Sequence, residues 1–158
     1  MKLRDIVRRG AVIARVKSST RDEAITELID ALVASGAASP SVKGELIAAV
    51  LDRERKGSTG FGKGVAIPHV KHRDIKGMAA AIGVSPSGID FNALDKQPVY
   101  SVILLLSPAS DPDAHLKAME VIFKHLSQEN FRRFLRQATS EDEIWTLLED
   151  ADNQTLGS

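Results

Sequence analysis

The residues best placed to do chemistry are a histidine and the glycine-rich segment before it. Gly60, Gly62 and Gly64 alternate just ahead of an apolar run, Val65 to Ile67, and His69 follows that run after one proline. Glycines let the backbone approach another group closely. Imidazole is half neutral near pH ~6.5, so one ring nitrogen keeps a free lone pair at neutral pH. His69 is therefore a candidate nucleophile, suited to attack on phosphorus.

Phosphoryl transfer depends on in-line positioning and on groups that stabilise spread negative charge. Amides of the glycine loop and a nearby arginine are able to supply both. The alternative interpretation is that the glycines only make a tight connection, and that His69 ends a strand with no chemical role. The residue pattern alone leaves both interpretations open.

The same segment matches most of the nucleotide-binding pattern G-x-x-x-x-G-K-[ST], with Gly57, Gly62 and Lys63 in place. The final position is Gly64, which has no hydroxyl for a magnesium ion. The loop also follows a predicted helix and enters a predicted strand, the reverse of the required order. A nucleotide site is therefore not expected here.

The elements that must position His69 are helices on either side of short strands. Capping signals and apolar spacing predict helices from Thr20 to about Gly36, from Ser39-Pro40 into 52–56, from about Asp113, through Phe131 to Leu135, and from Ser140. Apolar runs predict strands at 11–16, 65–67, 78–84 and 99–106, whereas 57–64 is too rich in glycine for a helix or a regular strand. The expected inward residues of the last helices include Leu116, Met119, Phe123, Leu126, Phe131, Phe134 and Leu135. Helices flanking a sheet indicate an α/β or α+β architecture.

The composition fits one domain. The chain has 158 residues, 43% of them hydrophobic, enough for one sizeable core. Lys plus Arg and Asp plus Glu both total 21, so no overall field attracts nucleic acid or a membrane surface. The absence of Cys excludes disulfides and thiolate chemistry, and suits a reducing compartment. We expect one cytoplasmic domain over 1–152, without a signal peptide or membrane span, and a flexible tail over 153–158.

Residues 51 to 69 resemble a known signature. Three short runs in this segment are similar to the signature of fructose/mannitol-type enzyme IIA domains of the sugar phosphotransferase system. They are Leu51-Asp52-Arg53-Glu54, Ser58-Thr59-Gly60-Phe61-Gly62 and Val65-Ala66-Ile67-Pro68-His69. The resemblance extends from the Thr20 helix to the last helix. It implies a single α/β domain with a mixed parallel and antiparallel sheet flanked by helices.

The resemblance also implies a chemistry. His69 would be phosphorylated on Nε2 by the phosphocarrier protein HPr or a relative of it, with no metal or organic cofactor. Arg53 and His115 occupy the positions of two family site residues. The planar guanidinium of Arg53 would bind phosphoryl oxygens. His115 would contact His69 or the phosphoryl group from the start of a helix. Taken alone, Arg53 reads as an exposed charge beside Glu54 and His115 as a surface histidine.

The remaining site residues are divided between the phosphate and a partner. Ser58, Thr59, Gly60, Gly62 and Gly64 are the expected phosphate-binding loop residues, and Phe61 and Val70 are the expected partner contacts. Phe61 is either an exposed contact or a core residue. The family usually has a small residue where Val70 stands, and two effects are open: a narrower approach for the partner, or only a restrained backbone.

Within the family, residues 57–60 and 88–95 resemble the nitrogen-regulatory branch more than dedicated sugar permease components. Phosphate would then pass to a separate enzyme IIB or stay as a regulatory mark, since a phosphoryl group adds up to about two negative charges. The alternative function is a regulatory protein-binding module on the same fold that works without phosphorylation.

Two other kinds of site are not expected. We do not expect the acids to cluster with the histidines, and His69 and His72 lie on a predicted post-strand loop with no assured common direction. A metal site built from His69, His72, His115 and His125 is therefore not predicted. Arg132, Arg133 and Arg136 near Lys124 suggest nucleic-acid binding, but a solvated helix face explains them better in a chain of zero net charge.

Overall fold

The apolar run after Pro98 forms the strand around which the fold is built. In the computed structural model, which describes residues 1–154, β6 covers Val99–Pro108. Its odd-numbered residues Ile103 and Leu105 belong to one buried core, and its even-numbered residues Val102, Leu104 and Leu106 belong to another. Both faces of the strand are covered, which is why the run is continuously apolar instead of alternating.

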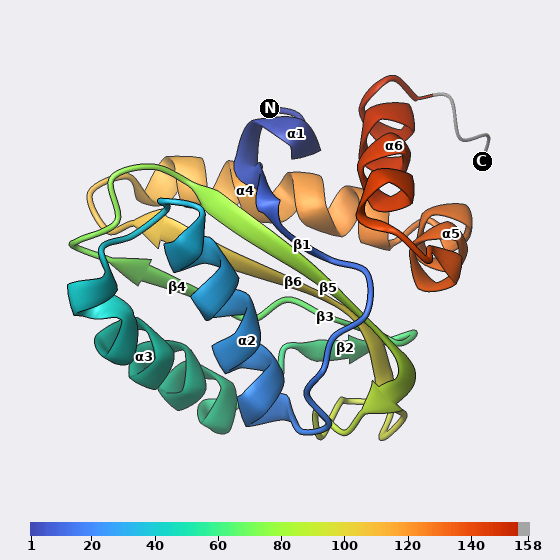
Figure 1. Cartoon of the computed structure of the whole chain (residues 1–158), viewed down its shortest axis with the longest axis horizontal. Helices are drawn as coiled ribbons and strands as arrows, with labels where there is room; N and C mark the ends of the chain where they lie inside the picture. The colour runs from blue at the N-terminus through green and yellow to red at the C-terminus, as the bar shows by residue number, and fades with distance from the viewer. Residues whose placement is uncertain (155–158) are drawn as a thin grey trace.

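Six strands within residues 1–154 form one mixed sheet (Figure 1). Strand β1 (Val7–Ile13) pairs parallel with β5 (Ala79–Ile89), which is antiparallel to β6. On its other side β6 pairs parallel with β3 (Val65–Ala66) and β4 (His69–His72), and β2 (Gly60–Gly62) is antiparallel to β3. The predicted α/β class with a mixed sheet is confirmed.

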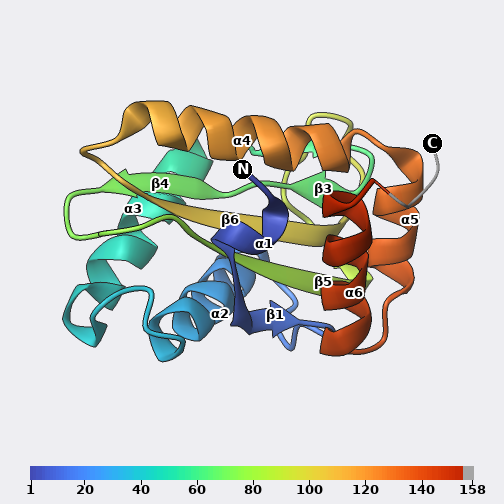
Figure 2. The same cartoon turned by 90° about the horizontal axis from the view of Figure 1, so that it is seen from above.

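Helices cover both faces of the sheet (Figures 1 and 2). The helices α2 (Arg21–Ala34) and α3 (Lys43–Lys56) lie on one face. The other face is covered by α1 (Leu3–Ile6), α4 (Pro112–Leu126), α5 (Glu129–Gln137) and α6 (Glu141–Asp152). Among residues 1–154, no helix has both the length and the apolar character needed to cross a bilayer.

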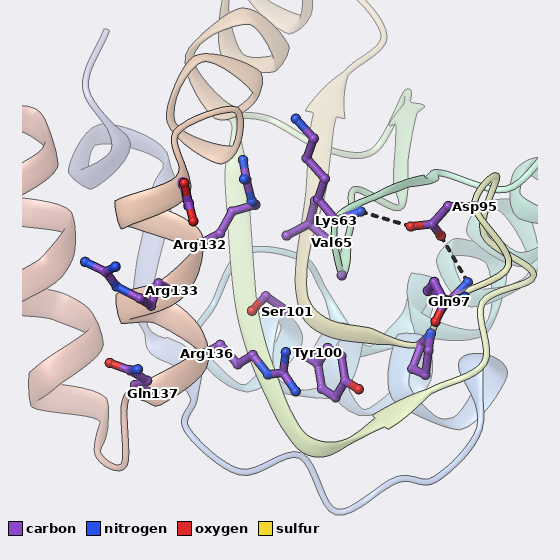
Figure 3. A pocket seen from close by; sticks show the side chains of 13 residues that line it. Lys63, Val65, Asp95, Gln97, Tyr100, Ser101, Arg132, Arg133, Arg136 and Gln137 are labelled. Atoms are coloured by element: carbon purple, nitrogen blue, oxygen red, sulfur yellow. Dashed lines mark hydrogen bonds between the residues drawn. The ribbon is translucent and has the colours of Figure 1, made fainter. Parts of the chain in front are cut away.

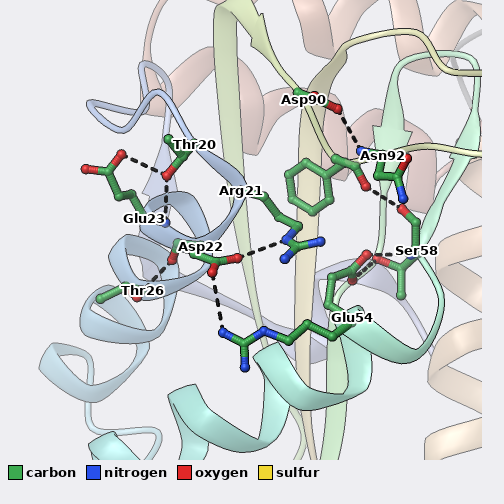
Figure 4. A network of polar contacts seen from close by, with 12 residues as sticks. Thr20, Arg21, Asp22, Glu23, Thr26, Glu54, Ser58, Asp90 and Asn92 are labelled. Carbon is green, nitrogen blue, oxygen red and sulfur yellow. Dashed lines mark hydrogen bonds and ion pairs between the residues drawn. The ribbon is translucent and has the colours of Figure 1, made fainter.

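The predicted helix starts are confirmed, with differences in detail. The Thr20 hydroxyl oxygen accepts the Glu23 amide at 3.2 Å, while its proton is donated to the Glu23 carboxylate at 2.8 Å (Figure 4). Ser140 accepts the Glu143 amide in the same way. The helix expected from Ser39-Pro40 begins with a separate 3₁₀ turn, Pro40–Val42, before α3.

The strand predictions needed three corrections. Residues 60–62 do form a strand, because glycine lets the chain pass close to Ala93: a Cβ at Gly60 would lie 2.9 Å from the Ala93 Cβ. Residues 69–72 form β4 rather than a loop, because β6 offers a free edge beyond the end of β3. The first strand begins at Val7 and ends at Ile13, earlier than predicted.

The expected inward face of α4 was wrong at Leu116 and Phe123, whereas Leu126 is buried and Met119 packs partly buried against the core. Leu116 and Phe123 are 60% and 42% exposed, and in α5 Phe134 is 40% exposed. The buried residues of α4 have the same three-and-four spacing, displaced by one position: His115, Ala118, Ile122, His125 and Leu126. The prediction failed because the two histidines were counted as polar.

The C-terminal helix ends at Asp152, where the predicted domain ends. The Asn153 amide donates to the Glu149 carbonyl at 3.0 Å and caps the helix. Most of the predicted tail, residues 155–158, lies outside the described residues, and the domain boundary stays a prediction.

Candidate active site

His69 is positioned by two short strands that follow one another along β6. Val65 and Ala66 pair with Ser101 and Val102, and His69 then pairs with Leu105 as the first residue of β4. Between them the Pro68 carbonyl accepts the Leu105 amide at 3.0 Å. The chain therefore stays hydrogen-bonded to the central strand through Pro68, directly before His69.

The His69 ring has a defined tautomer in its neutral form. Its Nδ1 lies 2.8 Å from the Ile67 carbonyl oxygen. A carbonyl only accepts, so Nδ1 carries the proton and Nε2 keeps the lone pair. Burial lowers the pKa of His69 below its ordinary value; the hydrogen bond to Ile67 opposes this, and the positive charge of Arg53 adds to it. The neutral ring, with its free Nε2, is therefore favoured at neutral pH.

His115 lies against His69 from the first turn of α4. The two ring centroids are 5.5 Å apart and the rings are tilted by 48°. The His115 side chain is buried, and its Nδ1 lies 2.7 Å from the Ser107 hydroxyl of β6. Burial lowers the pKa of His115, and positive charge on His69 lowers it further. Sequence reasoning missed Ser107, whose only signal was a hydroxyl inside an apolar strand.

Glu54 fixes the start of the glycine-rich loop, residues 57–64, through hydrogen bonds to Thr59. This carboxylate is 2% exposed and accepts two hydrogen bonds from Thr59, one from the amide and one from the hydroxyl, both at 2.7 Å. Ser58 donates to the Phe91 carbonyl at 2.8 Å and accepts the Gly60 amide at 3.0 Å (Figure 4). The amides of Thr59 and Gly60 are thus engaged inside the loop, and a phosphate contact from the loop residues stays a prediction.

The turn after Gly60 requires left-handed backbone at three consecutive residues. Gly62, Lys63 and Gly64 have φ values of +107°, +62° and +77°. The Gly64 carbonyl accepts the amides of both Tyr100 and Ser101. The turn that leads into β3 therefore favours glycine at positions 62 and 64.

Arg53 is exposed at the end of α3, and its Nη1 donates to the Gly57 carbonyl at 2.8 Å. Its charge reaches His69, since it lowers the pKa of that histidine. Arg53 therefore belongs to the electrostatic surroundings of the predicted site. Its contact with a phosphoryl group stays a prediction.

Phe61 and Val70, the expected partner contacts, lie on different sides. Phe61 is half-buried on β2, with its ring centroid 5.0 Å from that of the half-exposed Phe123. Val70 packs partly buried against the core beneath α2 and α3. Successive side chains of a strand point to opposite faces, so Val70 lies on the face away from His115. Of its two possible effects, the packing supports restraint of the backbone.

The other histidines occupy separate places. His72 is buried on β4, where its Nδ1 accepts the Asp74 amide and its Nε2 lies 3.0 Å from the Glu45 carboxylate. Two acids, Glu45 and Asp74, therefore cluster with His72, contrary to expectation. Arg73 also forms an ion pair with Glu45 at 3.1 Å, so an arginine supplies the positive charge beside this carboxylate. His125 packs on Phe131 with a ring separation of 5.7 Å.

The sequence and the fold agree with one family. The chain belongs to the EIIA 2 family of the phosphoenolpyruvate-dependent sugar phosphotransferase system, whose family model matches residues 5–151. Enzyme IIA components are phosphoryl carriers, so the predicted membership and general function are confirmed at the level of the family.

The relatives include regulatory and sugar-transport proteins. The nitrogen regulatory protein of Escherichia coli is 32% identical over 153 residues, 96% of this chain and 92% of that protein. The fructose-specific EIIABC component of Bacillus subtilis is 30% identical over 152 residues, but the chain spans only 24% of its length. The nitrogen-regulatory resemblance thus extends over nearly the full length of both chains.

Solved structures give the same result. Nitrogen regulatory protein IIA-Ntr from Neisseria meningitidis has a TM-score of 0.82 at 26% identity, with 91% of this chain and 97% of that chain covered. Mannitol IIA from Escherichia coli has a TM-score of 0.75 at 25% identity, with 88% and 96% covered.

Proposed function

We propose that His69 accepts a phosphoryl group on Nε2 from HPr or an HPr-like phosphocarrier in the cytoplasm, and that it passes the group on to an enzyme IIB or keeps it as a regulatory mark. The observation that carries the proposal is the contact between His69 Nδ1 and the Ile67 carbonyl, 2.8 Å long. It fixes the proton on one nitrogen and leaves the lone pair on the other.

The transfer needs no other nucleophile. The Nε2 lone pair attacks phosphorus, and the N–P bond forms as the bond between phosphorus and the donor breaks. The lowered pKa of His69 keeps the attacking ring neutral at pH 7. The phosphorylated ring carries added negative charge, which the exposed guanidinium of Arg53 and the adjacent ring of His115 are placed to stabilise.

The surface beside the histidine pair supports a protein partner. Leu116 directly follows His115 and is 60% exposed, and Phe123 is 42% exposed where it meets Phe61. Large exposed apolar side chains next to a reactive group are typical of docking surfaces. The mannitol enzyme IIA of Escherichia coli, which shares this fold, was solved in complex with phosphorylated enzyme IIB. The same surface of this chain would serve both a donor and an acceptor.

Regulation is supported by the relatives. The nitrogen regulatory proteins match this chain over most of their length, whereas the fructose component carries much more chain than this match covers. The phosphorylated and bare forms differ by up to about two charges at His69, enough to change which partner binds.

The test is intact-mass spectrometry after incubation with phosphoenolpyruvate, enzyme I and HPr, away from acid. We expect a gain of one phosphoryl group in the parent and in His72→Ala, and none in His69→Ala. His72 is the matched control because it lies on the same strand with its ring bound to Glu45 instead. No gain in the parent with several donor systems would favour the module that works without phosphorylation.

A further inference from the structure

A hollow lies on the face of the sheet that carries α4, α5 and α6, at the end of β6 away from Ser107 (Figure 3). Its volume is about 700 Å³, within the range of small-molecule sites. Its walls are α5, the turn between β2 and β3, and the start of β6. The residues that line it include Lys63, Tyr100, Ser101, Arg132, Arg133 and Arg136.

The hollow has an excess of positive charge. Four cationic side chains line it, against the two carboxylates of Asp95 and Glu129. Both oxygens of Asp95 already accept backbone amides, from Lys63 at 3.2 Å and from Gln97 at 3.0 Å (Figure 3). The whole chain has zero net charge, so this excess is local.

The guanidinium groups are held by uncharged partners. Arg136 lies over the Tyr100 ring, 3.5 Å from its centroid, and Arg132 donates to the Leu126 carbonyl at 2.9 Å. Arg133 donates to the Asn130 amide oxygen at 3.0 Å, and its guanidinium points away from Tyr100 (Figure 3). An arginine fixed by a ring or a carbonyl keeps its full charge and several unused donors.

Tyr100, on which Arg136 rests, is itself fixed in place. A Cβ at Gly64 would lie 3.1 Å from one edge of its ring, and a Cβ at Gly88 would lie 3.0 Å from the opposite edge. Both glycines have positive φ, +77° and +85°. The ring thus fits between two positions without side chains, and the cation on its face is preorganised before any ligand arrives.

The geometry points to a binding site for a small polyanion, whose phosphate or carboxylate groups are held by Arg132 and Arg136 with Lys63. A planar guanidinium pairs with two oxygens of such groups at once. The concave shape and the fixed arginines favour a compact ligand over an extended nucleic acid. Ser101 is four residues before Leu105, the register partner of His69, so the hollow is roughly 13 Å from that histidine along β6.

The test is isothermal titration of the unphosphorylated full chain with pyrophosphate and with citrate, in chloride buffers of matched ionic strength. The variants are Arg132→Gln, Arg136→Gln and Arg136→Lys, the last of which keeps the charge but loses the fork. Arg8→Gln removes the same charge from an exposed position on β1, at the far edge of the sheet. Thermal unfolding checks that each variant is folded. If Arg136→Gln does not fold, Arg136→Lys is the variant that tests the role of Arg136.

We expect saturable binding at one site, weakened about tenfold or more in both Gln variants, because a hydrogen-bonded charge is lost. Arg136→Lys should also weaken it, and Arg8→Gln should change it less than about twofold. Binding of pyrophosphate alone assigns a phosphate ligand, and binding of citrate alone assigns a polycarboxylate. No saturable binding of either anion, or an equal loss in Arg8→Gln, overturns the proposal. His69→Ala should bind as the parent does, which separates this result from the phosphorylation test.

Discussion

Two imidazoles are oriented by contacts at the same kind of nitrogen. His69 uses Nδ1 to reach a backbone carbonyl, and His115 uses Nδ1 to reach the Ser107 hydroxyl. Each ring is left with Nε2 for other contacts. At the scale of single residues, the site therefore consists of one reactive nitrogen, a neighbouring ring, and the groups that stop both rings from turning.

His115 can be tested by replacing its ring. His115→Ala should slow phosphorylation of His69 about 10²-fold, because the imidazole placed to stabilise developing negative charge is lost. The measurement is the single-turnover rate with an excess of phosphorylated donor. Ser107→Ala should cost less than about tenfold, since the imidazole remains and only its orientation is freed. A rate within twofold of the parent for His115→Ala would remove His115 from the site.

The buried histidines should make stability depend on pH. Burial lowers the pKa values of His69, His115 and His125, while in the unfolded chain these groups titrate near about 6.5. Below that pH the unfolded state binds more protons, so the free energy of unfolding is highest above it and falls as the pH decreases. Urea unfolding at several pH values measures the slope.

His125 offers a variant for the same experiment. Its Nδ1 makes no hydrogen bond within residues 1–154, so His125→Leu removes a titrating group without breaking a contact of that nitrogen. The slope of stability against pH below about 6.5 should become shallower. An unchanged slope would mean that His125 does not take part.

At the scale of elements, Glu54 connects the end of α3 to the loop before β2. A carboxylate that is 2% exposed and accepts two hydrogen bonds has no water to replace them. Its position five residues before Thr59 lets one side chain set the path of the chain between the helix and the strand. The loop can therefore hold its shape whatever occupies the site.

Glu54→Ala should lower the free energy of unfolding by about 2–3 kcal/mol, because it leaves the Thr59 amide unsatisfied in a buried place. Thr59→Val removes only the hydroxyl and should cost about half as much. Denaturant titration gives both values. If the double variant costs no less than the sum of the two single changes, the contacts are not coupled as the geometry requires.

Much of the element order could be predicted because its signals are local. Thr20 with Glu23 and Ser140 with Glu143 mark helix starts within four residues, and the segment around His69 carries a recognisable signature. The missed features depend on distant partners. Strand β4 exists because β6 has a free edge, and Ser107 matters only because α4 returns over it.

At the scale of the whole molecule, the first helix α1 is hydrogen-bonded to the end of the last helix α6. Asp152, at the end of α6, accepts the amides of Leu3 and Arg4 at 2.7 and 3.1 Å, and the Arg4 Nε at 3.0 Å. Its side chain is 1% exposed. The Lys2 amide is capped locally by Asp5 at 2.8 Å, but the next two amides of α1 depend on a carboxylate almost 150 residues away, which no local pattern predicts.

Asp152→Ala should therefore destabilise the fold by about 2–3 kcal/mol, since buried hydrogen bonds to a charged group are lost. Glu149→Ala is the control, because its ion pair with Arg4 is longer, 3.6 Å, and partly exposed. Thermal unfolding of both variants measures the difference. Equal midpoints for the two would show that the ends are joined by apolar packing alone.

The central strand β6 also sets the distance between the histidine pair and the arginine-lined hollow. Ser101 and Ser107 are six residues apart with the same parity, so they mark one face at a separation of roughly 20 Å. Both serines are buried, and a protein partner with a standard footprint of about 800 Å² is wide enough to lie over the surface above both of them. A partner seated over the histidine pair would then also touch the rim of the arginine-lined hollow, and whatever fills that hollow becomes part of the surface that the partner meets.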